Sequence, residues 1–486
     1  MARITAVIDL GSNSARMAIF ERTSRYGFHL LTEVKSRVRI AENAYKNGGL
    51  LQSAAIERAI GALTDFASIA KSYGARKIIA IATSATRDAP NKAEFLRAAR
   101  DASGLQIRAI DGKEEARLGG VAAANLLAFK EGVTIDVGGG STEFALIKEG
   151  KIADTISFNL GTVRLKELFF DEKKGAKEAA RFVLDTLEPL KGAFACSRII
   201  GMGGTMRALA AAIIKAESYP LAALHGFSFD VESYGDFLDR VVKSDFSGLK
   251  GLGFKSDRFD VIREGTLIFK LAAQIIGAKE ALISGAGVRE GAFLNDLLRG
   301  SGGRLPNGIE PSLVSLLDRF GGDGKQTHWA AVNAARLFDL LKPLHKLDDS
   351  RKRALIVAAK LSGTGAAIDP YYPAEQEAAL AQNGLSYGFS HADRLLIATL
   401  LTARQKKELD AWIPPKQFER FLPEAKTARW LALILFVTQK ANAARGRPKI
   451  DYSLNGKTLT IAGASYLSRE AFNRFKPPFD LEIALI

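Results

Sequence analysis

The sequence predicts an α/β protein built from a duplicated lobe, with a ligand clamped between the two copies. Two segments share one pattern: residues 6–20 (AVIDLGSNSARMAIF) and residues 133–147 (VTIDVGGGSTEFALI). Each reads as a strand ending near an Asp, a tight turn rich in Gly or Ser, and a second strand. The two copies are separated by about the length of one small domain. Each copy is therefore expected to open its own lobe.

Both turns have the composition of a phosphate-binding loop. Glycines have no Cβ, so the backbone of Gly138, Gly139 and Gly140 can approach a ligand closely and present successive N–H groups to an anion. Ser141 and Thr142 follow these glycines. The first turn offers N–H groups and side-chain donors from Gly11, Ser12, Asn13 and Ser14. A pair of ordinary β-hairpins is the alternative, but repetition of the whole pattern favours phosphate binding.

Acidic residues flank both turns. Asp9 and Asp136 stand where a hard cation would be held beside phosphate oxygens, through water. Glu143 lies two residues after Ser141 and therefore shares its face of the strand. We expect Glu143 to bind metal or to polarise water, with an exposed hairpin acid as the alternative.

Glu115 is the candidate catalytic base. It begins a helix directly after a predicted strand at residues 106–110, and α/β folds bind ligands at the carboxyl ends of strands. A carboxylate there can deprotonate a water that attacks phosphorus. The alternative is that Glu114 and Glu115 only complement the dipole of the helix.

Other segments offer donors for an anion. Residues 83–87 (TSATR) close a predicted strand with hydroxyls and the Arg87 guanidinium, although a helix cap is the alternative. A third Gly-rich turn with Gly203, Gly204 and Thr205 precedes a predicted helix. Arg164 and Arg289 are candidate positive charges near the same cleft.

The composition indicates an anionic partner and a reducing compartment. The chain has 486 residues and a net charge of +15, which is typical either of a protein that binds polyanions or of a generally basic one. Residues 416–449 are locally rich in Lys and Arg, but a solvated helix face is the alternative. No nucleic-acid-binding motif is recognisable. The single cysteine, Cys196, excludes an intrachain disulfide.

The longest apolar stretch, residues 430–437, is much shorter than the ~20 residues of a membrane span and predicts a buried helix. The first residues read as a core strand rather than a signal peptide. We therefore expect a cytoplasmic protein that binds neither membrane nor nucleic acid.

Strands and helices alternate up to about residue 300. Strands are predicted at 77–82, 106–110, 198–200 and 281–284, and helices at 92–102, 114–129 and 289–298. After the Gly/Pro-rich segment 301–306, helical periods dominate, as at 328–341 and 351–361. The tail returns to strand alternation, with a hairpin turn at Asn455–Gly456. A helical domain and a small α+β end are therefore expected after the two lobes.

On these motifs, the chain resembles the exopolyphosphatase / guanosine pentaphosphate phosphohydrolase (Ppx/GppA) family of the sugar kinase–Hsp70–actin superfamily. The matching segments include DLGSNSARMAIFE, ATSATRDAPN, IDGKEEARLGG, IDVGGGSTEF, NLGTVRLKELF, GMGGTMRALA and SGAGVREG. The resemblance implies two ribonuclease-H-like (actin-like) lobes with an interlobe cleft, at residues 1–126 and 127–304. It implies an all-α HD-like domain at 305–446 and a small α+β region at 447–486.

The resemblance also implies roles for residues in the cleft. Glu115 matches the general base, and Asp136 and Glu143 match acidic residues of catalysis and metal binding. Residues matching the phosphate loops are Ser12, Asn13, Ser14, Gly138, Gly139, Ser141 and Thr142, and Arg87 matches a basic position of the family. In the helical region, the His–Asp metal pair of the family is replaced by Ser362 and Gly363, so no second metal centre is expected there. The remaining His328 is expected to be structural.

The implied activity is exopolyphosphatase: hydrolysis of the terminal phosphate of inorganic polyphosphate with Mg²⁺, with Mn²⁺ as the alternative cation. The alternative with the same machinery is a guanosine pentaphosphate (pppGpp) 5′-phosphohydrolase. An alternative of another class is a non-catalytic sensor of polyphosphate or nucleotide, and a kinase of the wider superfamily is a further one. A homodimer is expected.

Overall fold

The computed structural model describes residues 3–170, 175–404, 409, 412–473 and 475–486. The chain divides into two compact units, Met1–Ile309 and Glu310–Ile486, and each is considered by itself. Among the described helices, none combines the length and the apolar character needed to cross a bilayer.

The first unit opens with a five-stranded mixed sheet. Its strands are β1 (Arg3–Leu10), β2 (Ala15–Arg22), β3 (Phe28–Ser36), β4 (Lys77–Ala82) and β5 (Ile107–Ala109). They lie in the order β3-β2-β1-β4-β5. The β1–β2 and β2–β3 pairs are antiparallel, whereas β1–β4 and β4–β5 are parallel. The parallel strands end at the edge where the first hairpin turns.

The second sheet repeats this arrangement with one additional edge strand. It contains β6 (Gly132–Val137), β7 (Thr142–Lys148), β8 (Lys151–Phe158), β9 (Arg198–Met202), β10 (Ser228–Asp230) and β11 (Glu280–Ile283). The order β10-β11-β9-β6-β7-β8 places β8-β7-β6-β9-β11 in correspondence with β3-β2-β1-β4-β5, with the same strand directions. The predicted duplicated α/β fold is confirmed.

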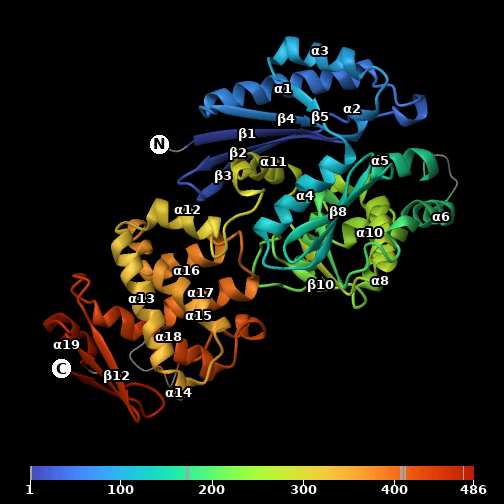
Figure 1. Ribbon diagram of the computed structural model, residues 1–486. Coiled ribbons are helices and arrows are strands. Elements are labelled where there is room, and N and C mark those ends of the chain that lie inside the picture. The colour runs from blue at the N-terminus through green and yellow to red at the C-terminus, as the bar shows by residue number, and fades with distance from the viewer. Residues whose placement is uncertain (1–2, 171–174, 405–408, 410–411, 474) are drawn as a thin grey trace. The chain divides into compact units, whose positions relative to one another are not determined.

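Two helices of this unit connect the lobes. α4 (Gly112–Leu126) follows the first sheet in sequence but packs against β7 and β8 of the second. α11 (Val288–Leu297) follows the second sheet but packs against β1 of the first, where the Phe293 ring stacks on Phe20 at 4.5 Å. Figure 1 shows α1 and α3 on one side of the first sheet and α11 on the other. The two lobes are therefore joined by an exchange of their closing helices.

The unit contains further helices besides α4 and α11. They are α1 (Ser53–Ser72), α2 (Ser84–Asp88), α3 (Lys92–Ser103), α5 (Thr162–Leu165), α6 (Ala176–Leu187), α7 (Gly203–Ala216), α8 (Gly235–Lys243), α9 (Phe246–Gly251) and α10 (Ile262–Ile276). Short turns of 3-10 or π type lie at Tyr45–Asn47, Lys166–Phe170, Glu188–Leu190, Ser256–Arg258 and Arg299–Ser301.

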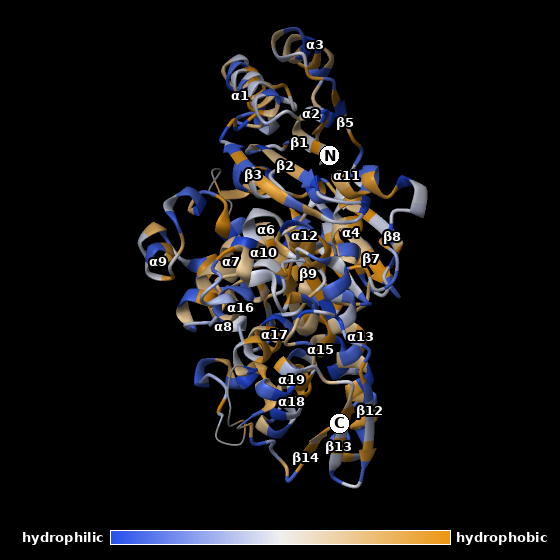
Figure 2. Ribbon diagram, turned by 90° about the vertical axis from the view of Figure 1, so that its left-hand side faces the viewer, coloured by the Kyte–Doolittle hydropathy of each residue, from blue (hydrophilic) through white to orange (hydrophobic). Residues whose placement is uncertain are grey.

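Apolar strands form the cores of both sheets. β7 is buried over all but its last residue and is coloured hydrophobic in Figure 2, as expected for a strand covered on both faces. Ile8, Met17 and Ile19 are completely buried in the first sheet. This packing holds the hairpin turns on rigid supports.

The second unit is a helical bundle with a small sheet. Its helices are α12 (Pro311–Phe320), α13 (Gly324–Leu340), α14 (Lys342–His345), α15 (Ser350–Leu361), α16 (Pro373–Gly384), α17 (His391–Ala403), α18 (Ala425–Ala441) and α19 (Tyr466–Phe472), with 3-10 turns at Thr364–Ala367 and Lys416–Phe421. The strands β12 (Asp451–Asn455), β13 (Thr458–Ala462) and β14 (Glu482–Leu485) form a three-stranded sheet. The apolar stretch 430–437 is buried within α18, as predicted.

A buried ion pair lies beside Ser362 and Gly363, the residues at the position of the family's His–Asp metal pair. Arg404 pairs with the fully buried Glu377 and donates to Ser362 Oγ at 2.5 Å, and Gly363 N–H donates to Glu377 at 2.6 Å. The Ser362 hydroxyl and the Gly363 N–H are thus engaged by protein groups. His328 lies exposed on α13, and its structural role stays a prediction. The HD-like character of this unit stays a prediction.

Candidate functional site

The two predicted turns have the same local geometry. Gly11 N–H donates to the Ser14 carbonyl at 3.2 Å, and Gly138 N–H donates to the Ser141 carbonyl at 3.0 Å. Asp9 lies opposite Arg16 in the first hairpin, and Asp136 lies opposite Glu143 in the second. The two hairpins thus share an Asp near the end of their first strand. The residue opposite that Asp differs, because it is the cation Arg16 in the first lobe and the carboxylate Glu143 in the second.

The turns meet each other across the two lobes. A Cβ built on Gly139 would lie 2.8 Å from the Ser12 Cβ, and one on Gly140 would lie 2.5 Å from the Ser84 Oγ. Ser12 Oγ and Ser84 Oγ are hydrogen-bonded at 3.0 Å, and the hydroxyl of Tyr45 fills the space that a side chain at Gly140 would need. Only a glycine backbone permits this approach.

One cavity of about 140 Å³ lies between the turns. Most residues expected to act at this site line it: Asp9, Ser12, Asn13, Ser14, Glu115, Asp136, Gly138, Gly139, Ser141, Glu143, Gly204 and Thr205. The hairpins, the start of α4 and the start of α7 therefore line a single cavity.

Three predicted residues lie behind the cavity wall. Gly140 is enclosed by Ser12, Ser84 and Tyr45, and its carbonyl accepts from Arg164 Nε at 3.0 Å. The Thr142 hydroxyl donates to the Leu160 carbonyl inside the second lobe. Arg87 contacts the site through Glu115 rather than through the cavity itself.

Glu115 and Glu143 are buried carboxyl groups in this site. Burial raises the pKa of Glu115 well above its usual range, and the charges of Glu143 and Asp9 raise it further. Arg87 acts in the opposite direction, with its Nη1 3.2 Å from Glu115 Oε2. Burial raises the pKa of Glu143 to about 8, against the effect of a hydrogen bond from Ser157 Oγ at 2.8 Å. Without a ligand, Glu143 therefore keeps its proton near neutral pH, and burial shifts the pKa of Glu115 in the same direction.

Asp9 and Asp136 suit a cation. Within the described part of the chain, Asp9 Oδ1 is buried without a hydrogen-bond partner. Burial raises the pKa of Asp9 to about 6 and also raises that of Asp136. In the described ranges, no group of three or more His, Cys, Asp or Glu side chains is arranged to hold a metal ion. A hard cation here would need oxygen ligands from phosphate and water beside those of the protein.

Four arginines also line the cavity: Arg16, Arg207, Arg258 and Arg289. Glu33 Oε1 holds Arg16 and Arg289 at 3.1 Å each. Burial, together with the charges of Arg16 and Arg289, lowers the pKa of Arg207 to about 10. Burying several guanidinium groups together costs free energy unless a bound anion pairs with them.

The sequence analysis identified Arg289 among these four but not the other three. The position of Arg16 in the site could have been predicted from the repeat. Arg16 lies two residues after Ser14, just as Glu143 lies two residues after Ser141. Arg207 lies one helical turn after Gly203, at the start of α7. Arg258 lies on a short 3-10 turn, where no local pattern indicates its position over Gly204.

The start of α7 completes the wall. Gly203 has φ of +74°, and a side chain there would overlap Asp136 Oδ1. The first N–H groups of a helix are unpaired and attract anions. Gly203, Gly204 and Thr205 therefore form a third donor group beside the two hairpin turns.

A family model of the Ppx/GppA phosphatase family matches residues 18–300, which is more than half of the chain. A bifunctional 3-dehydroquinate synthase/phosphatase of Fusobacterium nucleatum is 32% identical over 301 residues, an alignment that covers 58% of this chain and 45% of that protein. The chain thus spans less than half the length of this curated relative.

Solved structures agree with this match. The crystal structure of the Aquifex aeolicus member of the Ppx/GppA family is 26% identical with a TM-score of 0.53, covering 62% of this chain and 99% of that one. An exopolyphosphatase from Cytophaga hutchinsonii is 22% identical with a TM-score of 0.56, covering 62% of this chain and all of that one, and indicates the fold alone.

Proposed function

Because the chain belongs to the Ppx/GppA phosphatase family, we propose that it is an exopolyphosphatase that releases terminal orthophosphate from inorganic polyphosphate. The observation that carries the proposal is the convergence of two hairpin turns, four arginines and Glu115 on one cavity. Hydrolysis of a phosphoanhydride depends mainly on positioning and on charge stabilisation. The turns, the arginines and Glu115 would supply both the positioning and the charge stabilisation.

The turns and arginines would bind the terminal phosphate. Both turns and the start of α7 line one cavity. Backbone N–H groups fixed in this way would need no reorganisation when charge develops on the phosphoryl oxygens. Arg207 and Arg289 are held by Gly285 O at 3.1 Å and by Glu33 at 3.1 Å. Donors held in this way are oriented before the substrate arrives.

Glu115 would remove the proton from the attacking water. Its high pKa in the free protein makes the carboxylate a strong base once the proton has left. Arg87 holds one carboxylate oxygen and leaves the other available for water. The anhydride bond then breaks, the water oxygen joins the terminal phosphorus, and the shortened chain leaves with its bridging oxygen.

Mg²⁺, or Mn²⁺, would neutralise charge on the phosphate oxygens when bound. Asp9 and Asp136, with Glu143, would hold it, because all three line the cavity and Asp9 Oδ1 has no hydrogen-bond partner among the described residues. Loss of protons from Asp9 and Glu143 would accompany this binding.

The charge of the protein favours the long polyanion as substrate. A net charge of +15 attracts a chain of phosphates, and a cavity of about 140 Å³ takes only its reacting end. The pppGpp 5′-phosphohydrolase is the alternative with the same chemistry, and the relative rates on the two substrates decide between them. We further propose a cytoplasmic homodimer.

Phosphate release should be measured with Mg²⁺ across polyphosphate lengths and on pppGpp, for the wild type, Glu115→Gln and Glu114→Gln. Removal of a general base costs about 10²–10⁴-fold in rate, so Glu115→Gln should lose nearly all release. Glu114 pairs with Arg117 and Arg108 outside the cavity, so Glu114→Gln should keep it. Full release by Glu115→Gln would refute the mechanism. Binding without any release by the wild type would favour the sensor.

A further inference from the structure

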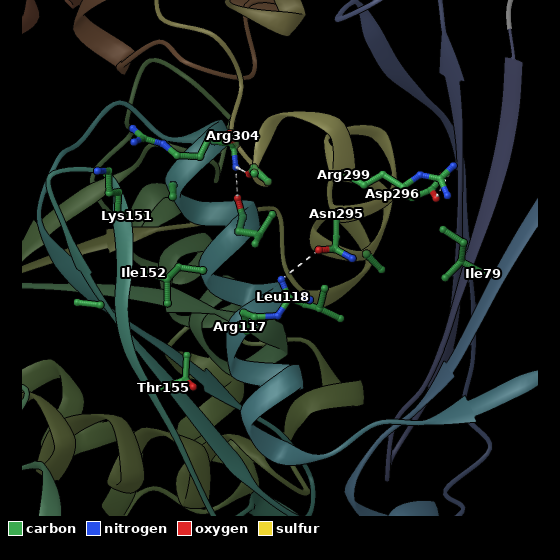
Figure 3. Close-up of a pocket in the computed structure, with 18 of the residues that line it drawn as sticks. Ile79, Arg117, Leu118, Lys151, Ile152, Thr155, Asn295, Asp296, Arg299 and Arg304 are labelled. Atoms are coloured by element: carbon green, nitrogen blue, oxygen red, sulfur yellow. Dashed lines mark hydrogen bonds and ion pairs between the residues drawn. The ribbon is translucent and has the colours of Figure 1, made fainter.

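A second and larger cavity lies in the first unit, away from the proposed active site. Its volume is about 1050 Å³, and its walls come from β4, β5, α4, β8 and α11. Figure 3 shows Lys151, Ile152 and Thr155 on one side and Arg117 and Leu118 on α4 in the middle. Opposite them lie Asn295 and Asp296 of α11, with Arg299 on the short turn that follows it. No residue of this cavity lines the other one.

Positive charge predominates around this cavity. The basic side chains are Lys77, Arg108, Arg117, Lys151, Arg299 and Arg304, against only two acidic ones, Asp154 and Asp296. Lys77 and Arg299 share Asp296, at 2.5 and 3.6 Å. Lys151 and Arg304 have no acidic partner in the described portion of the chain, so their charges are available to a ligand.

The floor of the cavity is apolar. Leu118, Val121 and Ala292 are buried along α4 and α11, and Ile79 and Ile152 are half-buried on the flanking strands. Ligand sites typically combine an apolar lining with a few placed polar groups, in cavities of about 300–1,000 Å³. A bare inorganic chain of phosphates would leave this apolar surface unused.

From this combination we propose that the second cavity is an effector site for an organic polyphosphate the size of a nucleoside triphosphate. The phosphates would pair with Lys151 and Arg304, and the base and sugar would lie on the apolar floor. A ligand there would contact β4 of the first sheet and β8 of the second at the same time, because both strands line the cavity.

The two connecting helices link this cavity to the proposed active site. α4 places Glu115 in the active-site cavity and Leu118, Val121 and Asn125 in the second. α11 likewise places Arg289 in the active-site cavity and Asn295 in the second cavity. The helices are in tight contact, since a side chain on Gly291 would overlap the Leu118 carbonyl. A ligand that shifts α4 against α11 would therefore alter the position of Glu115 relative to the arginines.

Binding of GTP, ATP and tripolyphosphate should be measured by calorimetry on the full chain carrying Glu115→Gln, which prevents turnover. In this background, Lys151→Ala/Arg304→Ala should weaken binding of the nucleotides at least tenfold at one site. Lys215→Ala/Arg240→Ala removes the same charges from exposed helix positions outside both cavities and should leave binding unchanged. Ala153→Trp, on an exposed strand position that lines the cavity, should block the site while keeping its charges.

Arg207→Ala separates this site from the active site. Nucleotide binding that survives Arg207→Ala but is lost in Lys151→Ala/Arg304→Ala supports the proposal. Nucleotide binding that is lost only in Arg207→Ala overturns it, as does equal affinity of the second site for tripolyphosphate. Because binding is measured directly, these outcomes do not depend on which substrate the active site hydrolyses.

Discussion

Arg87 Nη1 lies 3.2 Å from Glu115 Oε2, and it also donates to the Ile110 carbonyl at 3.4 Å. The guanidinium is thus fixed between the end of one strand and the buried carboxyl group that we propose as the base. Its charge is the main influence lowering the pKa of Glu115, against burial and the neighbouring carboxylates that raise it. Arg87 therefore positions Glu115 and sets the pH at which it loses its proton.

Replacement of Arg87 by Gln should shift the acidic limb of the pH–rate profile upward. Without the positive charge, Glu115 holds its proton to higher pH, so kcat/KM near neutral pH should fall by about 10-fold or more. Activity should partly return at alkaline pH. The measurement is kcat/KM for phosphate release between pH 6 and 10.

Arg108→Gln is the matched control for this profile. Arg108 lies 3.2 Å from Glu114, the neighbour of Glu115, and its side chain is exposed. The control should keep the wild-type profile. An unchanged profile in Arg87→Gln would refute the role assigned to this arginine.

Glu143→Gln should stabilise the free protein at high pH. The pKa of Glu143 is about 8 in the fold against 4.5 ordinarily, so the folded state binds its proton more tightly, and this contribution to stability is lost as pH rises from 4.5 through 8. Above pH 8 the buried charge is a cost that Gln removes, worth about 1–3 kcal/mol. Urea unfolding at pH 6 and pH 9 checks this, and a gain of the same size at both pH values would contradict it.

Gly140→Ala should separate the two turns. The added Cβ would lie 2.5 Å from Ser84 Oγ and 3.0 Å from Ser12 Oγ, and it would overlap the Tyr45 hydroxyl. We expect a loss of about 1–3 kcal/mol in unfolding free energy and a clear loss of kcat, because overpacking must be relieved by moving one turn. Gly61→Ala is the control, since nothing lies within 4 Å of its Cβ in α1. Wild-type kcat in Gly140→Ala would show that the close approach is dispensable.

Mg²⁺ should raise the melting temperature more at pH 8 than at pH 6. Asp9 and Glu143 lose their protons near pH 6 and 8 in the free protein, and a cation binds only the ionised groups. We expect the melting temperature to rise by a few degrees at millimolar Mg²⁺. Each kcal/mol of stabilisation raises the melting temperature of a small domain by about 4–8 °C, and that of a chain of this size by less. Asp9→Asn should abolish it, whereas Asp65→Asn, on the exposed face of α1, should not. The same increase in Asp9→Asn would place the cation elsewhere.

The hairpins could be predicted from sequence because each turn signal is local. Asp, Gly and Ser at fixed spacing define the strand end and the turn, and both hairpins appear as β1–β2 and β6–β7. The edge strand β3 was not predicted. After the buried Phe28, its side chains are all half-buried or exposed, so its pattern resembles a polar segment.

The exchange of α4 and α11 is not visible in the sequence. An amphipathic pattern indicates that a helix has a buried face but does not say which sheet covers it. The same reason applies to Arg258, which reaches Gly204 only because the chain folds back between α9 and α10. Residues brought together by topology alone require the structure.

The most direct test of the account is a crystal structure of Glu115→Gln with bound tripolyphosphate. We predict that the terminal phosphate lies between the two hairpin turns and accepts hydrogen bonds from N–H groups of both. It should also contact Arg207 or Arg289, with residue 115 beside its phosphorus. A terminal phosphate held by one turn alone, or bound outside this cavity, would contradict the account.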